Sequence, residues 1–281
     1  MAIRILQNNY GKSKVRLLKV DRRNERHEIQ NLTIDIALEG DFDAIHKDGD
    51  NSLCLPTDTM KNTVYALAAE TEEIEQIEVF GRRLATHFLG KNPQVERVVI
   101  NIHQHGWKRM KFDDGEHVHA LIAGSGETRI AKIDVKRDSE TLESGIEDLI
   151  VMKTARSAFI GFLKDAYTTL PEMSDRVFST AIKAVWRYSN PDSAGEEVFD
   201  SIREKILHVF AEHDSLSVQH TLYAMGEAVL ETFSEIDEIA FSLPNIHYLP
   251  VDMTKFGKTN DNRVFVPTNE PHGLIEARLT R

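Results

Sequence analysis

The sequence predicts an α+β protein built from antiparallel sheets with helices on one face. Several stretches alternate apolar and polar residues with the period of a strand, and the clearest is Glu28–Glu39. Other stretches repeat apolar residues at spacings of three or four, as helices do. Strand-like stretches, helix-like stretches and further strand-like stretches follow one another, and this order occurs twice. A duplicated α+β domain accounts for that order.

Four strands and one interrupted helix are predicted in the first half. The strands occupy residues 14–20, 28–39, 94–105 and 116–123. The polar stretch Asp21–Arg26 suits a hairpin between the first two strands. The helix begins where Thr57 or Asp58 can cap its first turn, breaks near Thr71 and ends at Asn92-Pro93. A helix start of this kind exposes backbone N–H groups that hold an anionic oxygen well.

The second half repeats the pattern after a turn predicted at Gly124-Ser125-Gly126. Its helices begin at a capping box formed by Ser193 and Glu196, and at a cap supplied by Ser215 or Ser217. Its strands are expected at residues 128–136, 148–154, 178–188, 238–243, 247–251, 263–266 and 273–279. We therefore divide the chain into a first domain, residues 1–135, and a second, residues 136–281.

The composition is that of a soluble globular protein with an acidic surface. The 281 residues are 41% hydrophobic, carry a formal net charge of −11 and have a pI near 5.6. Nucleic-acid binding needs a basic face, so we expect none, and an anionic substrate needs locally placed cations. No apolar run approaches the roughly 20 residues of a membrane helix, and the N-terminus lacks the features of a signal peptide. One cysteine, Cys54, fits a reducing cytosol.

Twelve histidines raise the question of a metal site. His103 and His105, and likewise His117 and His119, are two apart and share a strand face, so two such pairs on neighbouring strands could bind zinc or copper. Nothing in the sequence fixes that strand register, and no further ligand spacing completes a site. We therefore predict no metal. Phosphate-binding glycine loops and serine nucleophile motifs are also absent, and Cys54 is predicted to be a small buried hydrophobe.

Short polar clusters remain at the edges of the predicted elements, and they match one known family in order along nearly the whole chain. The matching segments are Asn9–Arg16, Thr57–Tyr65, Phe159–Phe162, Tyr167–Glu172, Asp175-Arg176, Leu216–Gln219, Leu243–Tyr248 and Gly273–Ile275. With these segments the chain resembles the urate oxidase (uricase) family. Taken one at a time, these residues are compatible with structural roles, such as a solvated hairpin cation at Lys12 or a surface ion pair at Arg176. Their joint match to one family favours functional roles for these residues.

The resemblance implies two tandem tunnelling-fold (T-fold) domains, which assemble into a homotetrameric barrel with active sites at subunit interfaces. It implies oxidation of urate by dioxygen and water to 5-hydroxyisourate and hydrogen peroxide, with no cofactor. An electron-rich urate anion can act as its own reductant, so the protein supplies binding, orientation and electrostatics.

The resemblance also implies roles for particular residues. Lys12, Thr57 and His247 would form a proton relay. The substrate-binding residues would be Thr57, Asp58, Phe159, Leu170, Arg176, Val218, Gln219, Asn245 and Ile275. The residue types suit the task, because arginine presents a planar fork of donors and glutamine presents both a donor and an acceptor to an amide-like edge. An aromatic face suits a flat heterocycle.

Two departures from the family pattern concern residues beside the proposed relay. Pro56 stands where a small non-proline residue is expected, and Ile246 stands where a lysine is frequent. The chain ends without the Ser-Lys-Leu peroxisomal address, so we expect a cytoplasmic enzyme.

Two alternative functions stay open. One is another T-fold enzyme acting on pterins or purines, although a zinc site is usual there and only Cys54 is available. The other is a purine-binding protein without turnover.

Overall fold

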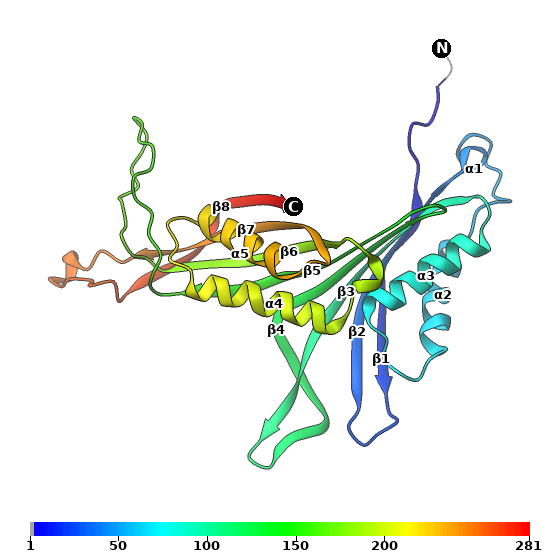
Figure 1. The fold of residues 1–281 in the computed structure, drawn as a ribbon, viewed down its shortest axis with the longest axis horizontal. Coiled ribbons are helices and arrows are strands. Elements are labelled where there is room, and N and C mark those ends of the chain that lie inside the picture. Colours follow the sequence, from blue (N-terminus) through cyan, green and yellow to red (C-terminus); the bar gives the residue numbers. More distant parts are fainter. Residues whose placement is uncertain (1–2) are drawn as a thin grey trace. The chain divides into compact units, whose positions relative to one another are not determined.

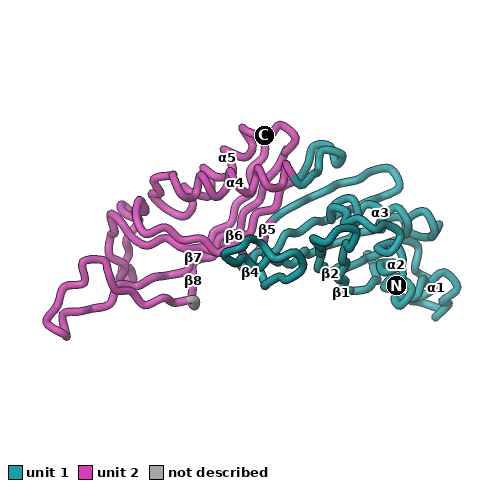
Figure 2. Tube along the Cα trace, turned by 90° about the horizontal axis from the view of Figure 1, so that it is seen from below, with its two compact units in different colours: residues 1–145, 187–196 teal, residues 146–186, 197–281 magenta. Residues whose placement is uncertain are grey.

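The computed structural model describes residues 3–281, apart from the side chains of Ser125 and Asn269 (Figure 1). The chain forms two compact units (Figure 2). Unit 1 comprises residues 1–145 and 187–196, and unit 2 comprises residues 146–186 and 197–281.

Unit 1 is an antiparallel sheet in sequence order, with helices on one face. Its four complete strands are β1 (Tyr10–Asp21), β2 (Glu28–Gly40), β3 (Val95–Phe112) and β4 (Gly115–Lys136). Its helices are α1 (Asp43–Lys47), α2 (Thr57–Ala69) and α3 (Ile77–Lys91), and its short 3-10 helix is η1 (Pro191–Ser193). Alternate residues of β2 are buried, from Gln30 to Leu38, because α2 and α3 pack across that face of the sheet.

Unit 2 repeats this arrangement. The strand β5 (Glu140–Lys153) begins in unit 1 and continues into unit 2, where β6 (Phe178–Tyr188), β7 (Ile236–Pro250) and β8 (Phe265–Thr280) follow in sequence order. Its helices are α4 (Glu196–Glu212) and α5 (Val218–Thr232), and η2 (Thr254–Phe256) is a single 3-10 turn. The helix α5 packs against β7 and β8. The predicted α+β class, with helices on one face of antiparallel sheets, is confirmed.

Several predicted elements are confirmed in detail. The first two strands pair as an antiparallel hairpin, and the predicted helix is interrupted between Ala69 and Ile77. The strand predicted at residues 178–188 is β6. The Ser217 side chain accepts a hydrogen bond from the His220 N–H and caps α5.

Other predictions are wrong, and irregular strands explain most of them. The predicted turn at residues 124–126 lies inside β4, and β7 and β8 are each one strand where two were expected. Strand pairing in β3–β4 and in β7–β8 shifts register, and each shift interrupts the alternation that marks a strand in sequence. The glycine at 124 fits because the backbone of Gly106 passes 3.0 Å from where its β-carbon would lie.

The predicted helix caps also need correction. Pro56 is the N-cap of α2 and gives no side-chain hydrogen bond, so Thr57 and Asp58 are the first two helical residues. Ser193 belongs to η1, three residues before α4 begins at Glu196. The helix α1 was missed because its five residues carry no apolar periodicity. Within residues 3–281, no helix has the length and apolar character needed to cross a membrane.

Candidate active site

Lys12 lies beside an irregularity in the first strand. On β1, Ser13 and Lys14 stand opposite the single residue Asp35, because pairing passes from Lys12 with Ile36 to Val15 with Ile34. Lys14 has a positive φ of 56°, and its N–H donates to Asp35 Oδ1 at 2.8 Å. This bulge separates Lys12 from the regular alternation of the strand and leaves its side chain half-buried.

Tyr10 fastens the start of β1 to the segment that leads into α2. Its hydroxyl oxygen accepts a hydrogen bond from the Leu55 N–H at 2.9 Å, and its ring packs edge-on against Phe42 with centroids 4.8 Å apart. Burial, together with the neighbouring Cys54 thiol, raises the pKa of Tyr10 to about 12. Cys54 is half-exposed, so its predicted burial is wrong. The tyrosine thereby holds Lys12 and Thr57 in one part of unit 1, a role that sequence reasoning did not assign.

The first turn of α2 is electrostatically suited to an anion. Thr57 is half-buried and Asp58 is exposed. Asp58 binds Lys61 Nζ at 2.5 Å and Asn62 Nδ2 at 3.0 Å. The Lys61 ammonium, and to a smaller extent Lys12, holds the pKa of Asp58 below its usual range. The Asp58 carboxylate is therefore engaged along the helix, which leaves the backbone N–H groups of the first turn as the donors of this region.

In unit 2, one short segment aligns two chain segments that carry candidate residues. On one side, Phe159 and Met173 exchange backbone hydrogen bonds of 2.8 and 3.0 Å, and the Arg176 N–H donates to Ser157 O at 2.8 Å. On the other side, the Ala158 N–H donates to Ser215 O at 2.7 Å. Residues 157–159 therefore set the spacing between Arg176 and the start of α5.

Arg176, Phe159 and His247 lie together in unit 2. The Arg176 guanidinium carbon is 5.5 Å from the centroid of the Phe159 ring. Burial lowers the pKa of Arg176, and its buried Nε has no hydrogen-bond partner in the described part of the chain. His247 is half-buried, and burial, the Arg176 cation and His272 lower its pKa, which favours the neutral imidazole. An unpaired fork of donors beside an aromatic ring and a neutral imidazole can bind a flat, oxygen-bearing heterocycle.

The start of α5 contributes Val218 and Gln219. Val218 is the first helical residue and is buried, whereas Gln219 is the second and is exposed. Ser217, the N-cap, fixes the first turn, and the Ser215 hydroxyl donates to Ser217 O at 3.0 Å. The capped first turn of α5 therefore presents its backbone and the exposed amide side chain of Gln219.

The hairpin of β7 and β8 positions Asn245, His247 and Ile275. Asn245 pairs with Gly273, and Leu243 pairs with Ile275, so Asn245 and Ile275 lie on one face of the hairpin. Between Asn245 and His247 the register shifts, and residues 269–272 of β8 stand opposite the single residue Ile246. This wide irregularity brings His272 close enough to His247 to lower its pKa.

The structure thus divides the candidate residues between the units. Lys12, Thr57 and Asp58 belong to unit 1, and the remaining candidates belong to unit 2. Leu170 lies on an exposed loop, with 54% of its surface accessible. Sequence reasoning assigned no role to Phe162, whose ring stacks on Phe159 at 4.8 Å. Its place in the segment Phe159–Phe162 was the available signal.

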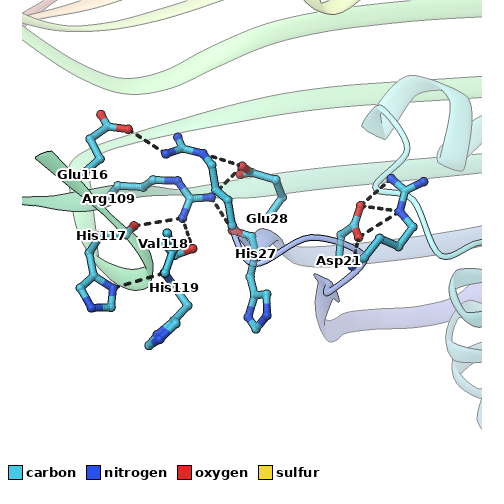
Figure 3. A network of polar contacts seen from close by, with 10 residues as sticks. Asp21, His27, Glu28, Arg109, Glu116, His117, Val118 and His119 are labelled. Carbon is cyan, nitrogen blue, oxygen red and sulfur yellow. Dashed lines mark hydrogen bonds and ion pairs between the residues drawn. The ribbon is translucent and has the colours of Figure 1, made fainter.

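The histidines considered as metal ligands lie in different surroundings. His103 and His105 pair with Ile130 and Thr128 of β4, so they do not stand opposite His117 and His119. His105 Nε2 is hydrogen-bonded to Thr33 Oγ1 at 2.8 Å. Figure 3 shows His117 and His119 in the β3–β4 hairpin, together with His27 and Arg109. Arg109 donates to the carbonyl oxygens of His27, His117 and Val118, which is a structural role. Among residues 3–281, no three metal-ligating side chains are grouped to hold an ion.

Comparisons with known proteins identify the family of the chain. A family model described as Uricase matches residues 8–134 and 142–276. The chain is 43% identical over 279 residues to a uricase of Arthrobacter globiformis, an alignment that covers 98% of this chain and 89% of the relative. The chain belongs to the uricase family. It is also 36% identical over 288 residues to a uricase of Oryctolagus cuniculus, which covers 99% of this chain and 95% of the relative.

Similarity to a solved uricase extends to the fold. The crystal structure of uricase from Arthrobacter globiformis superposes with a TM-score of 0.95 at 42% sequence identity, covering 100% of this chain and 96% of that one. The uricase match spans every candidate residue, from Lys12 in its first part to Ile275 in its second.

Proposed function

We propose that this uricase-family chain catalyses the oxidation of urate by dioxygen and water to 5-hydroxyisourate and hydrogen peroxide. The observation that carries the proposal is the grouping in unit 2 of the Arg176 guanidinium over Phe159, with His247 beside it. Urate is a flat anion whose edges alternate carbonyl oxygens and ring nitrogens. A half-buried guanidinium and an aromatic face are complementary to both features.

Binding is assigned to residues of both units. Arg176 donates its two parallel N–H groups to a carbonyl oxygen and an adjacent ring nitrogen of urate, and Gln219 pairs with the neighbouring amide-like edge. Phe159 stacks on the purine, which adds about 0.5–1.5 kcal/mol beyond burial of area. Val218 offers a backbone contact, and Leu170 and Ile275 line the pocket. The first-turn N–H groups of Thr57 and Asp58 face the oxygen of the five-membered ring.

Proton transfer is assigned to Lys12, Thr57 and His247. The Thr57 hydroxyl can donate and accept at once, so it passes a proton between the substrate and Lys12. His247, whose pKa is lowered, is neutral near pH 7 and can accept a hydrogen bond from water or from the Thr57 hydroxyl. Asn245 holds dioxygen or the attacking water above the ring.

The electrons come from urate itself. The urate anion gives up two electrons to dioxygen, water adds at carbon 5, and the products are 5-hydroxyisourate and hydrogen peroxide. The protein contributes orientation and fixed dipoles, so the proposal assigns no cofactor to the reaction.

The complete site is proposed to form between copies of the chain. Lys12, Thr57 and Asp58 of one copy complete the pocket that Arg176, Gln219 and His247 of another begin. A homotetramer also covers sheet edges that a single copy leaves open. We further propose that the boundary between the two repeated domains lies between residues 135 and 136. The enzyme is proposed to work in the cytoplasm.

The test is an assay of purified, chelator-treated protein. Urate absorbance is followed together with peroxide, and loss of one urate per peroxide formed is expected. No loss of urate would refute the enzymatic proposal. Activity that disappears on chelation and returns with added metal would refute the cofactor-free mechanism but leave the substrate assignment intact.

A further inference from the structure

Arg156 lies at the junction that connects the two substrate-binding segments of unit 2. It directly precedes Ser157, which pairs with Ser215 in a short parallel bridge. The Ser215 N–H donates to Arg156 O at 3.0 Å, and the Ala158 N–H donates to Ser215 O at 2.7 Å. The backbone around Arg156 thus holds the residues that lead to Phe159 beside those that lead to Val218 and Gln219.

The Arg156 side chain reinforces the same junction. Its Nε donates to Asp214 Oδ1 at 2.5 Å, its Nη1 donates to Glu212 Oε2 at 3.2 Å, and its Nη2 donates to Glu212 O. The Arg156 side chain therefore binds the Glu212 carboxylate and carbonyl at the end of α4, and the Asp214 carboxylate directly before Ser215. Its planar fork of donors makes such multiple contacts, which a lysine cannot reproduce.

The backbone of Arg156 has an unusual conformation. Its φ is +60°, in the left-handed region that favours glycine. Arg156 adopts this conformation while its side chain makes three polar contacts. A glycine at this position would relieve the backbone strain but would lose the side-chain contacts with Glu212 and Asp214.

We propose that Arg156 is a positioning residue, which sets the distance between the Arg176–Phe159 wall and the Val218–Gln219 turn. It does not touch the substrate. This proposal rests on the proposed function, because urate is the molecule that bridges the two segments. Arg176 and Gln219 grip the purine in both the ground state and the transition state. Loosening the junction therefore weakens binding more than turnover.

The test compares Arg156→Gly and Arg156→Ala with the unaltered enzyme in steady-state urate kinetics. Both variants are expected to raise KM about tenfold while kcat changes less than about threefold, since small displacements of binding groups have large effects. Asp214→Asn should act in the same direction, and adding it to Arg156→Gly should have little further effect. Lys47→Ala is the matched control, because Lys47 forms a comparably exposed ion pair with Asp43 in unit 1.

A second measurement does not depend on activity. Hydrogen exchange at the Ala158 and Ser215 amides should speed up in Arg156→Gly and stay unchanged in Lys47→Ala. A KM within twofold of the unaltered enzyme in both Arg156 variants, or unchanged exchange at both amides, would overturn the positioning role. An unaltered enzyme that consumes no urate would instead overturn the proposed function, and the exchange data would still decide whether Arg156 clamps the junction.

Discussion

At the residue scale, Thr57 joins a small structural contribution to a proposed chemical role. It is the first residue of α2, and the cap position is taken by Pro56 without a side-chain hydrogen bond. Thr57→Ala removes no cap hydrogen bond, so it should change the free energy of unfolding by no more than about 1 kcal/mol. It should lower kcat by about a hundredfold or more, because a positioned proton carrier is removed. Thermal unfolding and urate kinetics on the same preparation check both expectations.

The neighbouring Thr59→Ala is the control for this variant. Thr59 lies in the same turn, is exposed and has no proposed contact with substrate. Its replacement should leave kcat within about twofold. If Thr57→Ala lost stability and activity in equal measure, Thr57 would be a structural residue only.

The pKa of His247 gives a prediction about pH. Burial, Arg176 and His272 all lower this pKa, so the neutral imidazole persists to lower pH than in an isolated histidine. Activity that needs neutral His247 should fall as the pH drops through that lowered pKa. Replacing His272 by asparagine removes one of the three causes, so His272→Asn should move the acid limb of the kcat/KM profile to higher pH.

The same variant should leave the plateau above the acid limb within about twofold, because His272 is not placed in contact with substrate. His208→Asn is the control, since His208 is exposed on α4. An acid limb that moves to lower pH, or stays where it is, would show that His272 does not act on the group that titrates.

Individual residues were predictable from the sequence only through their joint match to one family. The types and order of Lys12, Thr57 and Arg176 pointed to a purine site, but no local signal identified the residues that support them. Tyr10 works through one hydrogen bond to the Leu55 backbone, and Arg156 works through an ion pair across 58 positions. Contacts between distant segments leave no periodicity in a sequence.

At the scale of elements, the β1–β2 hairpin depends on a glycine. A β-carbon at Gly11 would lie 1.7 Å from the carbonyl oxygen of Ile36, so any residue with a side chain would clash with the β2 backbone. Gly11→Ala should therefore separate the strands next to Lys12 and destabilise the protein by about 2 kcal/mol or more. Chemical denaturation measures this loss, and urate turnover should fall with it because Lys12 moves.

Gly90 offers a matched comparison within the same unit. It lies in α3, and a β-carbon there would meet nothing within 4 Å. Gly90→Ala should stabilise the protein by about 0.5–1 kcal/mol, because alanine favours a helix over glycine. If both alanine variants behaved alike, the close approach at Gly11 would not be the cause.

Element predictions succeeded where alternation was regular and failed where it was interrupted. The strand β6 was predicted with its observed bounds because its buried residues alternate without a break near its centre. The strands β7 and β8 were each split in two, because their pairing skips residues beside His247. The irregularity that hid the strand in the sequence is the one that places His272 near the proposed site.

At the scale of the whole molecule, the proposed sites combine unit 1 of one copy with unit 2 of another. Two variants with defects in different units should then rescue each other. Lys12→Met and Arg176→Ala are each expected to be inactive alone. Unfolding and refolding them together should restore a fraction of the specific activity, because mixed tetramers of the proposed kind would contain some sites with both halves intact.

Mixing Arg176→Ala with a His247→Ala variant is the control. Both defects lie in unit 2, so every site of a mixed tetramer lacks one of the two side chains. Restored activity in this control, or none in the first mixture, would contradict sites shared between copies.

The return of residues 187–196 to unit 1 has a consequence for how the protein is made. Within unit 1, Arg82 Nη1 binds Asp192 Oδ1 at 2.8 Å, and η1 belongs to the same unit. A ribosome that has synthesised only the first 145 residues has therefore not yet supplied all of unit 1. Although domains generally fold in order of synthesis, this N-terminal unit reaches its full set of contacts only when translation has passed residue 196.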